Sequence, residues 1–238
     1  MMDTVTLLAT FVGALIQVAV GVGFSVVVGP VLVLGSGAKA AVPTLLALNV
    51  VVSIIGMYGF RLEDGAGAVG QSIGGTLVGI LVGAATFPYL SESFVTTTMG
   101  LMLLGGSLLG WGSCRQLGWK AVAGIGTISG IATAWSATPG PVMALGLIMA
   151  GHDGSRVRLL VQPISLAAYG IALGMLGQTV WSVALTAPHM GSLLATTVMG
   201  SLLGLLVGPR LPSPIFLHAI RIFSAIAGLM LLARAIAN

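Results

Sequence analysis

The sequence predicts an all-α membrane protein of about eight hydrophobic elements, in two inverted four-element repeats whose first elements are broken or re-entrant. The chain of 238 residues is 57% hydrophobic and only 6% charged, with a mean hydropathy of +1.11. Apolar runs of about 18 residues or more recur along its length, as expected of helices that cross a bilayer. Two stretches about 111 residues apart share one pattern, which indicates an internal duplication.

The composition excludes several classes of protein. Nine Lys and Arg with five Asp and Glu residues are too few to cover the surface of a water-soluble domain of this length. The net charge of +4 lies in short loops, where it reports topology rather than nucleic-acid binding. Cys114 is the single cysteine, so no disulfide framework is expected. The first apolar run begins at Thr4 without a basic segment before it, so we expect it to be retained.

The duplication is read from two aligned segments, TFVGALIQVAVGVGFSVVVGPVLVLG at 10–35 and AVAGIGTISGIATAWSATPGPVMALG at 121–146. Repeat 1 is assigned to residues 1–112 and repeat 2 to residues 121–238, with 113–120 as the loop between them. A second match consists of glycines at four-residue spacing, namely Gly75, Gly79 and Gly83 in one half and Gly200, Gly204 and Gly208 in the other. Small residues at this spacing let helices approach closely in lipid, so we expect these glycines to serve packing.

Each half begins with an element too long for one straight crossing. The stretch 4–38 would form a helix roughly 52 Å long, against a hydrocarbon core of roughly 30 Å. It is expected to break within GVGFSVVVGP at 21–30, where Gly21, Gly23 and Gly29 tolerate irregular backbone and Pro30 lacks a backbone donor. Its counterpart at 119–151 is expected to break at Gly140 and Pro141. Plain spans complete the plan at 41–60, 67–90, 94–112, 157–177, 188–208 and 214–236.

The basic residues discriminate between two topologies. If each broken element crosses once, the Lys and Arg residues divide almost evenly between the two sides. If each folds back as a re-entrant hairpin, only Lys39 and Arg234 lie on one side, and the other collects Arg61, Arg115, Lys120, Arg156, Arg158, Arg210 and Arg221. The hairpin arrangement follows the positive-inside rule better. It inverts the two halves and places both termini outside the cytoplasm.

Polar residues around the breaks are the candidate binding groups. Backbone groups freed at membrane depth must be buried or line a wet cavity, and helix N-termini created there are ready anion sites. Ser and Thr often bond back to their own helix, whereas Asn and Gln at bilayer depth cost more and point more strongly to function. The predicted substrate-binding set is Gln17, Gly23, Ser25, Asn49, Thr133, Ser136 and Gln162; further polar residues nearby are Ser53, Thr138 and Ser165.

No catalytic residue, metal site or cofactor is predicted. The five carboxylates fall in loops or at the N-terminus, so no buried Asp or Glu proton relay is expected; they are Asp3, Glu63, Asp64, Glu92 and Asp153. An intramembrane hydrolase would need a nucleophile with a base in reach. The histidines His152, His189 and His218 are scattered in loops or interfaces. We therefore expect a protein that is not an enzyme.

The residues also form a recognisable order. Gln17 precedes Gly23 and Gly29-Pro30, a Gly-Ala-x-Ala-Ala-Val start at Gly37 leads to Asn49, and a second break follows at Gly140-Pro141; a Gly-x3-Gly stretch then precedes Arg210 and a helix with Phe216 and Arg221. Over nearly the whole chain this order resembles the TauE/SafE family of sulfite exporters. Family members often have three or four consecutive glycines at the break, whereas Phe24 and Trp135 stand there in this chain.

The resemblance implies a multi-pass protein of the bacterial inner (cell) membrane that moves small sulfur-containing anions such as sulfite, sulfoacetate or other organosulfonates. We expect an exporter that works by alternating access, with the anion bound between the two broken helices. A passive anion channel or a non-transporting membrane assembly subunit is the alternative. The expected partners are the anion and the lipid bilayer, without nucleic acid. The sequence leaves open the exact substrate, the direction of transport, the coupling ion and whether the chain forms a homodimer.

Overall fold

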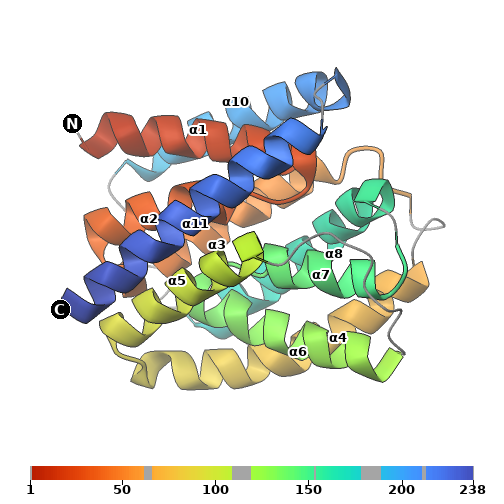
Figure 1. Cartoon of the computed structure of the whole chain (residues 1–238), viewed down its shortest axis with the longest axis horizontal. Coiled ribbons are helices and arrows are strands. Elements are labelled where there is room, and N and C mark those ends of the chain that lie inside the picture. Colours follow the sequence, from red (N-terminus) through yellow and green to blue (C-terminus); the bar gives the residue numbers. More distant parts are fainter. Residues whose placement is uncertain are drawn as a thin grey trace.

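Every segment of regular structure that the computed structural model describes is helical, which confirms the all-α prediction (Figure 1). The structure describes residues 2–61, 66–108, 119–152, 154–177, 189–210 and 213–237. These residues form ten α-helices and two short 3-10 helices, η2 (Phe87–Tyr89) and η3 (Gly208–Arg210). Most of the predicted inter-repeat loop 113–120 lies outside the described residues.

Five of the described α-helices precede residue 109 and five follow residue 118. The first half contains α1 (Met2–Val20), α2 (Phe24–Ser36), α3 (Ala38–Gly56), α4 (Ala66–Thr86) and α5 (Glu92–Leu108). The second half contains α6 (Trp119–Ser136), α7 (Gly140–Met149), α8 (Gly154–Met175), α10 (Met190–Val207) and α11 (Ser213–Ala237). The stretches 4–38 and 119–151 are thus each divided into two helices, at residues 21–23 and 137–139.

The first division lies at the start of the predicted break segment 21–30, ahead of Gly29 and Pro30. Gly29 and Pro30 are buried inside α2, while the non-helical residues are 21–23. Gly21 and Gly23 have φ angles of +101° and +141°, which residues other than glycine rarely adopt. Pro30 removes one backbone donor within α2, but the positive φ angles are what turn the chain. In the second half, Gly140 is the first residue of α7 and is followed by Pro141, in the first turn, where proline is tolerated.

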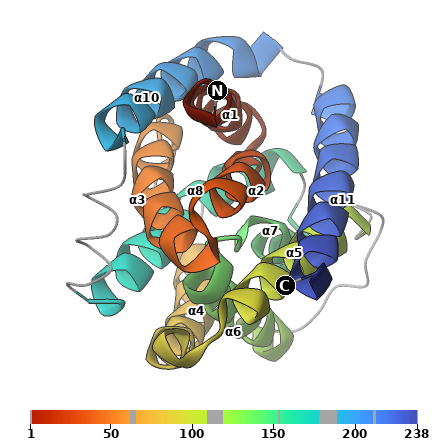
Figure 2. The same ribbon diagram turned by 90° about the vertical axis from the view of Figure 1, so that its left-hand side faces the viewer.

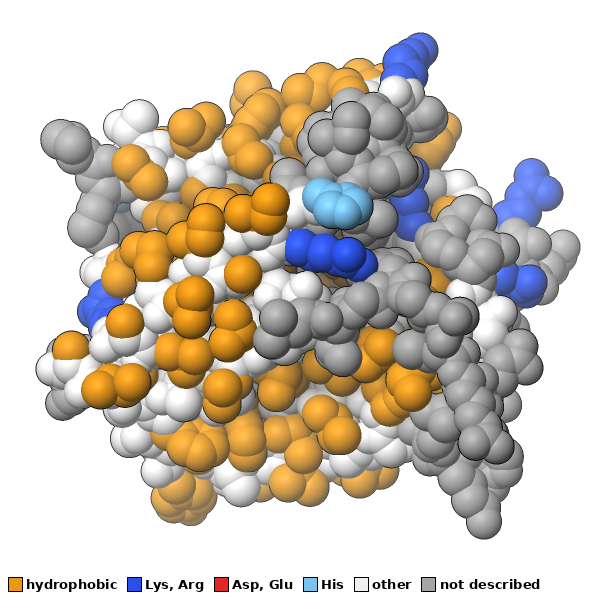
Figure 3. Space-filling view, in the orientation of Figure 1, with side chains coloured by type: hydrophobic (Ala, Val, Ile, Leu, Met, Phe, Trp, Pro, Cys, Tyr) orange, Lys and Arg blue, Asp and Glu red, His pale blue; other side chains and the backbone are white. Residues whose placement is uncertain are grey.

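The outer surface is apolar, as in a protein surrounded by lipid. Four helical segments are long and apolar enough to cross a membrane: Ala38–Gly56, Ser72–Tyr89, Arg156–Met175 and Met190–Val207. Large hydrophobic side chains are exposed along α4 and α10, among them Leu77, Val78, Leu81, Met199, Leu202 and Leu206. Figure 3 shows such side chains spread over one face of the molecule. A water-soluble monomer rarely exposes so much apolar surface, so these helices face lipid.

The repeated glycines bring two pairs of helices into backbone contact. A Cβ added at Gly79 of α4 would collide with the carbonyl oxygen of Thr127 in α6. A Cβ added at Gly200 of α10 would likewise collide with the carbonyl oxygen of Phe11 in α1. These contacts belong to the closest helix pairs of the fold, α4 with α6 and α1 with α10, and α5 packs on α11 in the same way. The expected packing role of the two glycine series is therefore confirmed.

The chain reverses at both interruptions. Three residues join α1 to α2, and the two helices pack side by side, as Figure 2 shows nearly end-on. Three residues likewise join α6 to α7, which also pack on each other. Helices α3 and α8 lie together in the interior, and Gly56 at the end of α3 contacts the amide of Gln162 in the first half of α8. The N- and C-termini lie at the same end of the molecule (Figure 1).

Candidate functional site

The two non-helical segments meet in the interior. The hydroxyl of Ser25, in the first turn of α2, donates a hydrogen bond of 2.5 Å to the carbonyl oxygen of Ala137. The side chain of Val22 also lies against Gly140, at 3.4 Å from a Cβ position there. Ser25 and Ala137 are 6% and 0% exposed. Two segments more than 100 residues apart in the sequence therefore share one buried polar junction.

Gln17 closes the first turn. Its side-chain Oε1 accepts a hydrogen bond of 2.9 Å from the backbone amide of Phe24. This amide is the first of α2 and has no carbonyl partner within the helix, so Gln17 acts as its cap from the end of α1. The backbone carbonyl of Gln17 in turn accepts from Gln162 Nε2 at 3.3 Å and from the Gly21 amide at 2.7 Å. Gln17 thus ties α1, α2 and α8 together.

Ser25 is the centre of the side-chain network. Asn49 Nδ2 donates to Ser25 Oγ at 2.9 Å and to the carbonyl of Leu45 at 2.8 Å. The hydroxyl of Tyr169, from α8, lies within hydrogen-bonding reach of Ser25 and Gln17. The structure therefore gathers Gln17, Ser25, Asn49 and Gln162, four of the predicted residues, at one place, while their role in binding stays a prediction.

The predicted residues of the second half bond within their own segment. Thr133 donates to the carbonyl of Ser129 at 2.7 Å, and Ser136 donates to that of Ala132 at 2.8 Å. Ser136 and Thr138 share a further hydrogen bond of 2.6 Å. All of these hydroxyl side chains are buried. This is the helix-bonding behaviour typical of Ser and Thr, so it is the carbonyl of Ala137 rather than Ser136 that reaches the first half.

The junction contains helix ends of both polarities. Helices α2 and α7 begin here, and α1 and α6 end here. By helix geometry the amides of Ser25 and Val26 have no partner within α2, and the helix dipole makes this end partly positive. The carbonyl ends of α1 and α6 are partly negative for the same reason. Anions are therefore favoured at the starts of α2 and α7, and cations at the ends of α1 and α6.

One face of α8 carries a polar stripe of four residues, which the sequence analysis did not recognise as a group. Arg158, Gln162, Ser165 and Tyr169 follow each other at spacings of four, three and four residues, which places them on one helix face. Arg158 Nη2 donates to the carbonyl of Val18 at 3.3 Å, close to the end of α1. The spacing is visible in the sequence, but only the packing of α8 shows that Tyr169 belongs with the site.

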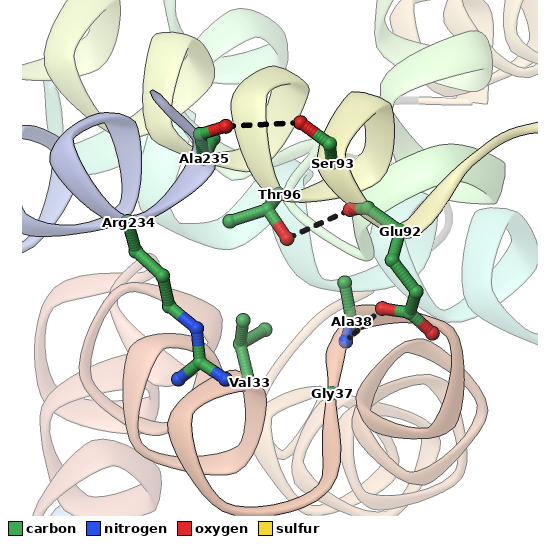
Figure 4. A pocket seen from close by; sticks show the side chains of 8 residues that line it. All are labelled: Val33, Gly37, Ala38, Glu92, Ser93, Thr96, Arg234 and Ala235. Atoms are coloured by element: carbon green, nitrogen blue, oxygen red, sulfur yellow. Dashed lines mark hydrogen bonds between the residues drawn. The ribbon is translucent and has the colours of Figure 1, made fainter. Parts of the chain in front are cut away.

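A separate cavity of about 220 Å³ lies at the end of the molecule that contains the C-terminus (Figure 4). Glu92, the first residue of α5, accepts hydrogen bonds from the amides of Ala38 at 2.7 Å and Lys39 at 3.2 Å, and so caps α3. Arg234 of α11 donates to the carbonyl of Leu34 near the end of α2 at 3.2 Å. These two charged side chains hold the α2–α3 connection and do not belong to the Ser25 network.

Three of the carboxylates that were predicted to lie in loops, Glu63, Asp64 and Asp153, are outside the described residues. Within the part of the chain that the structure describes, no group of three or more His, Cys, Asp or Glu residues could hold a metal ion.

The family of this chain follows from its sequence. The model of the family described as "Sulfite exporter TauE/SafE" matches residues 5–235, nearly the whole chain. The chain belongs to the TauE/SafE family. It is therefore a multi-pass membrane protein of a family of sulfite-type anion transporters rather than enzymes. No curated protein and no solved structure matches this TauE/SafE member.

Proposed function

We propose that this TauE/SafE protein exports small sulfur-containing anions, such as sulfite, sulfoacetate or other organosulfonates, by alternating access. The anion binds where the α1–α2 and α6–α7 hairpins meet. The observation that carries the proposal is the hydrogen bond from Ser25 to the carbonyl of Ala137, because it joins the two chain reversals in the interior. Ligand sites between two broken helices are the usual arrangement in transporters built from inverted repeats.

The packing of the helices supports the inverted repeat. Exchanging α1 with α6, α2 with α7, α3 with α8, α4 with α10 and α5 with α11 maps the main helix contacts onto one another. The pair α4–α6 becomes α10–α1, whereas α3–α8 and α5–α11 map onto themselves. The glycine-containing helix of each half therefore packs on the hairpin of the other half: α4 packs on α6, and α10 packs on α1. In this arrangement each hairpin is re-entrant, and the two enter from opposite sides of the membrane.

The charges support one orientation. Lys39 and Arg234 lie at the end of the molecule where α3 begins and α11 ends, whereas Arg61 and Arg156 flank the opposite ends of α3 and α8. Figure 3 shows Lys and Arg side chains gathered mainly toward one end. The positive-inside rule then places Arg61 and Arg156 in the cytoplasm of a bacterial cell and both termini outside it.

Anion binding requires an exchange of hydrogen bonds. The donors of Asn49 and Ser25 are already engaged, with Ser25 and Ala137 respectively. An anion at the start of α2 gains the amides of Ser25 and Val26, and it takes over donors from Asn49, Tyr169 and Ser25. The bond between the hairpins is then lost. Substrate binding is thereby linked to movement of one hairpin against the other, as alternating access needs.

The proposal extends to the full set Gln17, Gly23, Ser25, Asn49, Thr133, Ser136 and Gln162, with Tyr169 added. Gly23 supplies the positive φ that directs the α2 amides, and Thr133 and Ser136 shape the end of α6. Export of an anion is favoured by a cell interior that is electrically negative. No side-chain carboxylate is assigned to carry a proton.

The test is uptake of ³⁵S-sulfite into proteoliposomes that contain the purified protein. Wild type should give saturable uptake, and Ser25→Ala should lower kcat/KM about tenfold, because it removes one hydrogen-bond donor to the anion at a buried site. Ser36→Ala is the matched control, since Ser36 is on the same helix and bonds only to Leu32 of its own helix. Linear, non-saturable flux would indicate a channel. No protein-dependent flux of sulfite or a sulfonate would contradict the transport function.

A further inference from the structure

A row of buried oxygen atoms between α3 and α8 has no hydrogen-bond partner among the described residues. The atoms are Asn49 Oδ1, Ser53 Oγ, Gln162 Oε1 and Ser165 Oγ. All four side chains are at most 2% exposed. Buried polar groups are nearly always paired, and each exception calls for an explanation such as a bound water or ion. Four exceptions on two adjacent helices make this seam the most unusual polar feature of the fold.

The chemistry of the two amides is fixed by their other contacts. Asn49 Nδ2 points to the carbonyl of Leu45, and Gln162 Nε2 points to the carbonyl of Gln17. A carbonyl oxygen can only accept a hydrogen bond, so the side-chain atoms facing it must be the NH₂ groups. The unpartnered atoms of Asn49 and Gln162 are therefore carbonyl oxygens. They can be satisfied only by a hydrogen-bond donor or a cation.

The oxygens lie on the faces by which the two helices meet. Asn49, Ser53 and Gly56 are spaced by four and three residues on α3, and Gln162 and Ser165 by three on α8. The Gln162 amide fills the space next to Gly56, where a Cβ would come within 2.8–3.1 Å of its atoms. Gly56 thus leaves room for the side chain of Gln162 at the α3–α8 contact, on the face of α3 that carries Asn49 and Ser53.

The electrostatics favour a cation beside this seam. Gln162 contacts the carbonyl of Gln17 in the last turn of α1, where the helix dipole is partly negative. Arg158, one turn earlier on α8, already donates to the Val18 carbonyl at this end. Transporters with interrupted helices use such carbonyl ends, with side-chain oxygens, to coordinate Na⁺. An uncharged set of oxygen ligands suits a monovalent ion better than Ca²⁺ or Mg²⁺, which prefer carboxylates.

We infer that Ser53, Gln162 and Ser165 bind a Na⁺ ion, with a carbonyl from the end of α1 nearby and Asn49 one helical turn away on α3. Because Asn49 also donates to Ser25, it lies between the ion and the anion site. The positive charge attracts the Asn49 carbonyl oxygen, which keeps the NH₂ group facing Ser25, and it strengthens anion binding there. The coupling of Na⁺ to transport rests on the proposed function, whereas Na⁺ binding itself does not.

Thermal unfolding of the full-length protein in detergent tests the site without substrate. At constant ionic strength, replacing choline chloride with NaCl should raise the unfolding midpoint of wild type saturably, because a ligand that binds only the folded state stabilises it. Ser53→Ala and Ser165→Ala should each lower the apparent Na⁺ affinity about tenfold. Both should fold at least as well as wild type without Na⁺, since each removes a buried hydroxyl that has no partner.

Ser201→Ala is the matched control. Ser201 is also a fully buried hydroxyl that has no partner among the described residues, but it lies on α10. Its Na⁺ response should equal that of wild type. A wild-type midpoint that responds equally to choline and Na⁺ would overturn the site, as would an unchanged Na⁺ response in both Ser53→Ala and Ser165→Ala. Na⁺ binding without sulfite uptake would remove the proposed function but keep the site. Sulfite uptake without any effect of Na⁺ on the unfolding midpoint would remove the Na⁺ site but keep the proposed transport function.

Discussion

At the scale of single residues, the site depends on hydroxyl and amide groups rather than on charges. Ser25 donates to Ala137 and accepts from Asn49, and the Tyr169 hydroxyl lies within reach of it. The one proton of the Ser25 hydroxyl is already engaged with Ala137, so an anion must displace that bond to accept from Ser25. Tyr169 is the partner whose loss is easiest to isolate, because phenylalanine keeps the ring and removes only the hydroxyl.

We therefore expect Tyr169→Phe to raise the KM for sulfite about tenfold while leaving the unfolding midpoint within a few degrees of wild type. The phenylalanine ring still fills the space of a fully buried side chain. Tyr58→Phe is the control, because Tyr58 is 80% exposed and should transport as wild type does. Equal KM values in the two variants would remove Tyr169 from the site.

At the scale of helices, the fold depends on close contacts that only glycine allows. Gly79 and Gly130 bring α4 and α6 together, because a Cβ at either position would collide with backbone of the other helix. In lipid, such packing has to replace the hydrophobic effect as the force that joins helices. The hairpins are thus held against α4 and α10 by backbone contact and are not simply enclosed by bulky side chains.

Gly79→Leu should therefore destabilise the folded protein strongly, by roughly 1–3 kcal/mol or more, because the two backbones must separate. Gly74→Leu, on the same helix, should fold as wild type does, since a Cβ at Gly74 meets no atom within 4 Å. The measurement is the fraction of monodisperse protein after detergent extraction, with its unfolding midpoint. Equal losses in both variants would show that leucine on α4 is harmful for some reason other than the α6 contact.

The bounds of the plain spans could be predicted from hydropathy, because each is a continuous apolar run: 41–60 became α3 and 188–208 became α10, within a few residues. The exact position of the chain reversal in the first half could not be predicted in this way. Proline is the stronger helix breaker in isolated peptides, but Pro30 costs α2 only one hydrogen bond, and the chain turns instead at Gly21 and Gly23, where φ is positive.

The site could be predicted only in part for a similar reason. Buried Gln17, Asn49 and Gln162 stand out in apolar spans, because such residues are costly in lipid. Tyr169 does not stand out, since a tyrosine in a span is usually a packing residue or an interfacial anchor. Its role depends on which face of α8 meets Ser25, and that is set by the packing of α3 on α8.

At the scale of the whole molecule, we infer two halves related by an approximate two-fold exchange. This exchange relates the two hairpins to each other and relates the α4–α6 contact to the α10–α1 contact. The α3–α8 and α5–α11 contacts map onto themselves. The N- and C-termini lie at one end (Figure 1), which the two re-entrant hairpins and eight single crossings both allow. An arrangement with eight single crossings would instead place Arg61 and Arg156 on opposite sides of the membrane.

Cysteine accessibility in oriented membranes tests this central claim most directly. In a Cys114→Ser background, Arg61→Cys, Arg156→Cys and Lys39→Cys would each be exposed to a membrane-impermeant maleimide from either side. We predict that positions 61 and 156 react only from the cytoplasmic side and position 39 only from the opposite side. Reaction of position 61 from one side, with positions 39 and 156 reacting together from the other, would contradict the inverted hairpins and support eight single crossings.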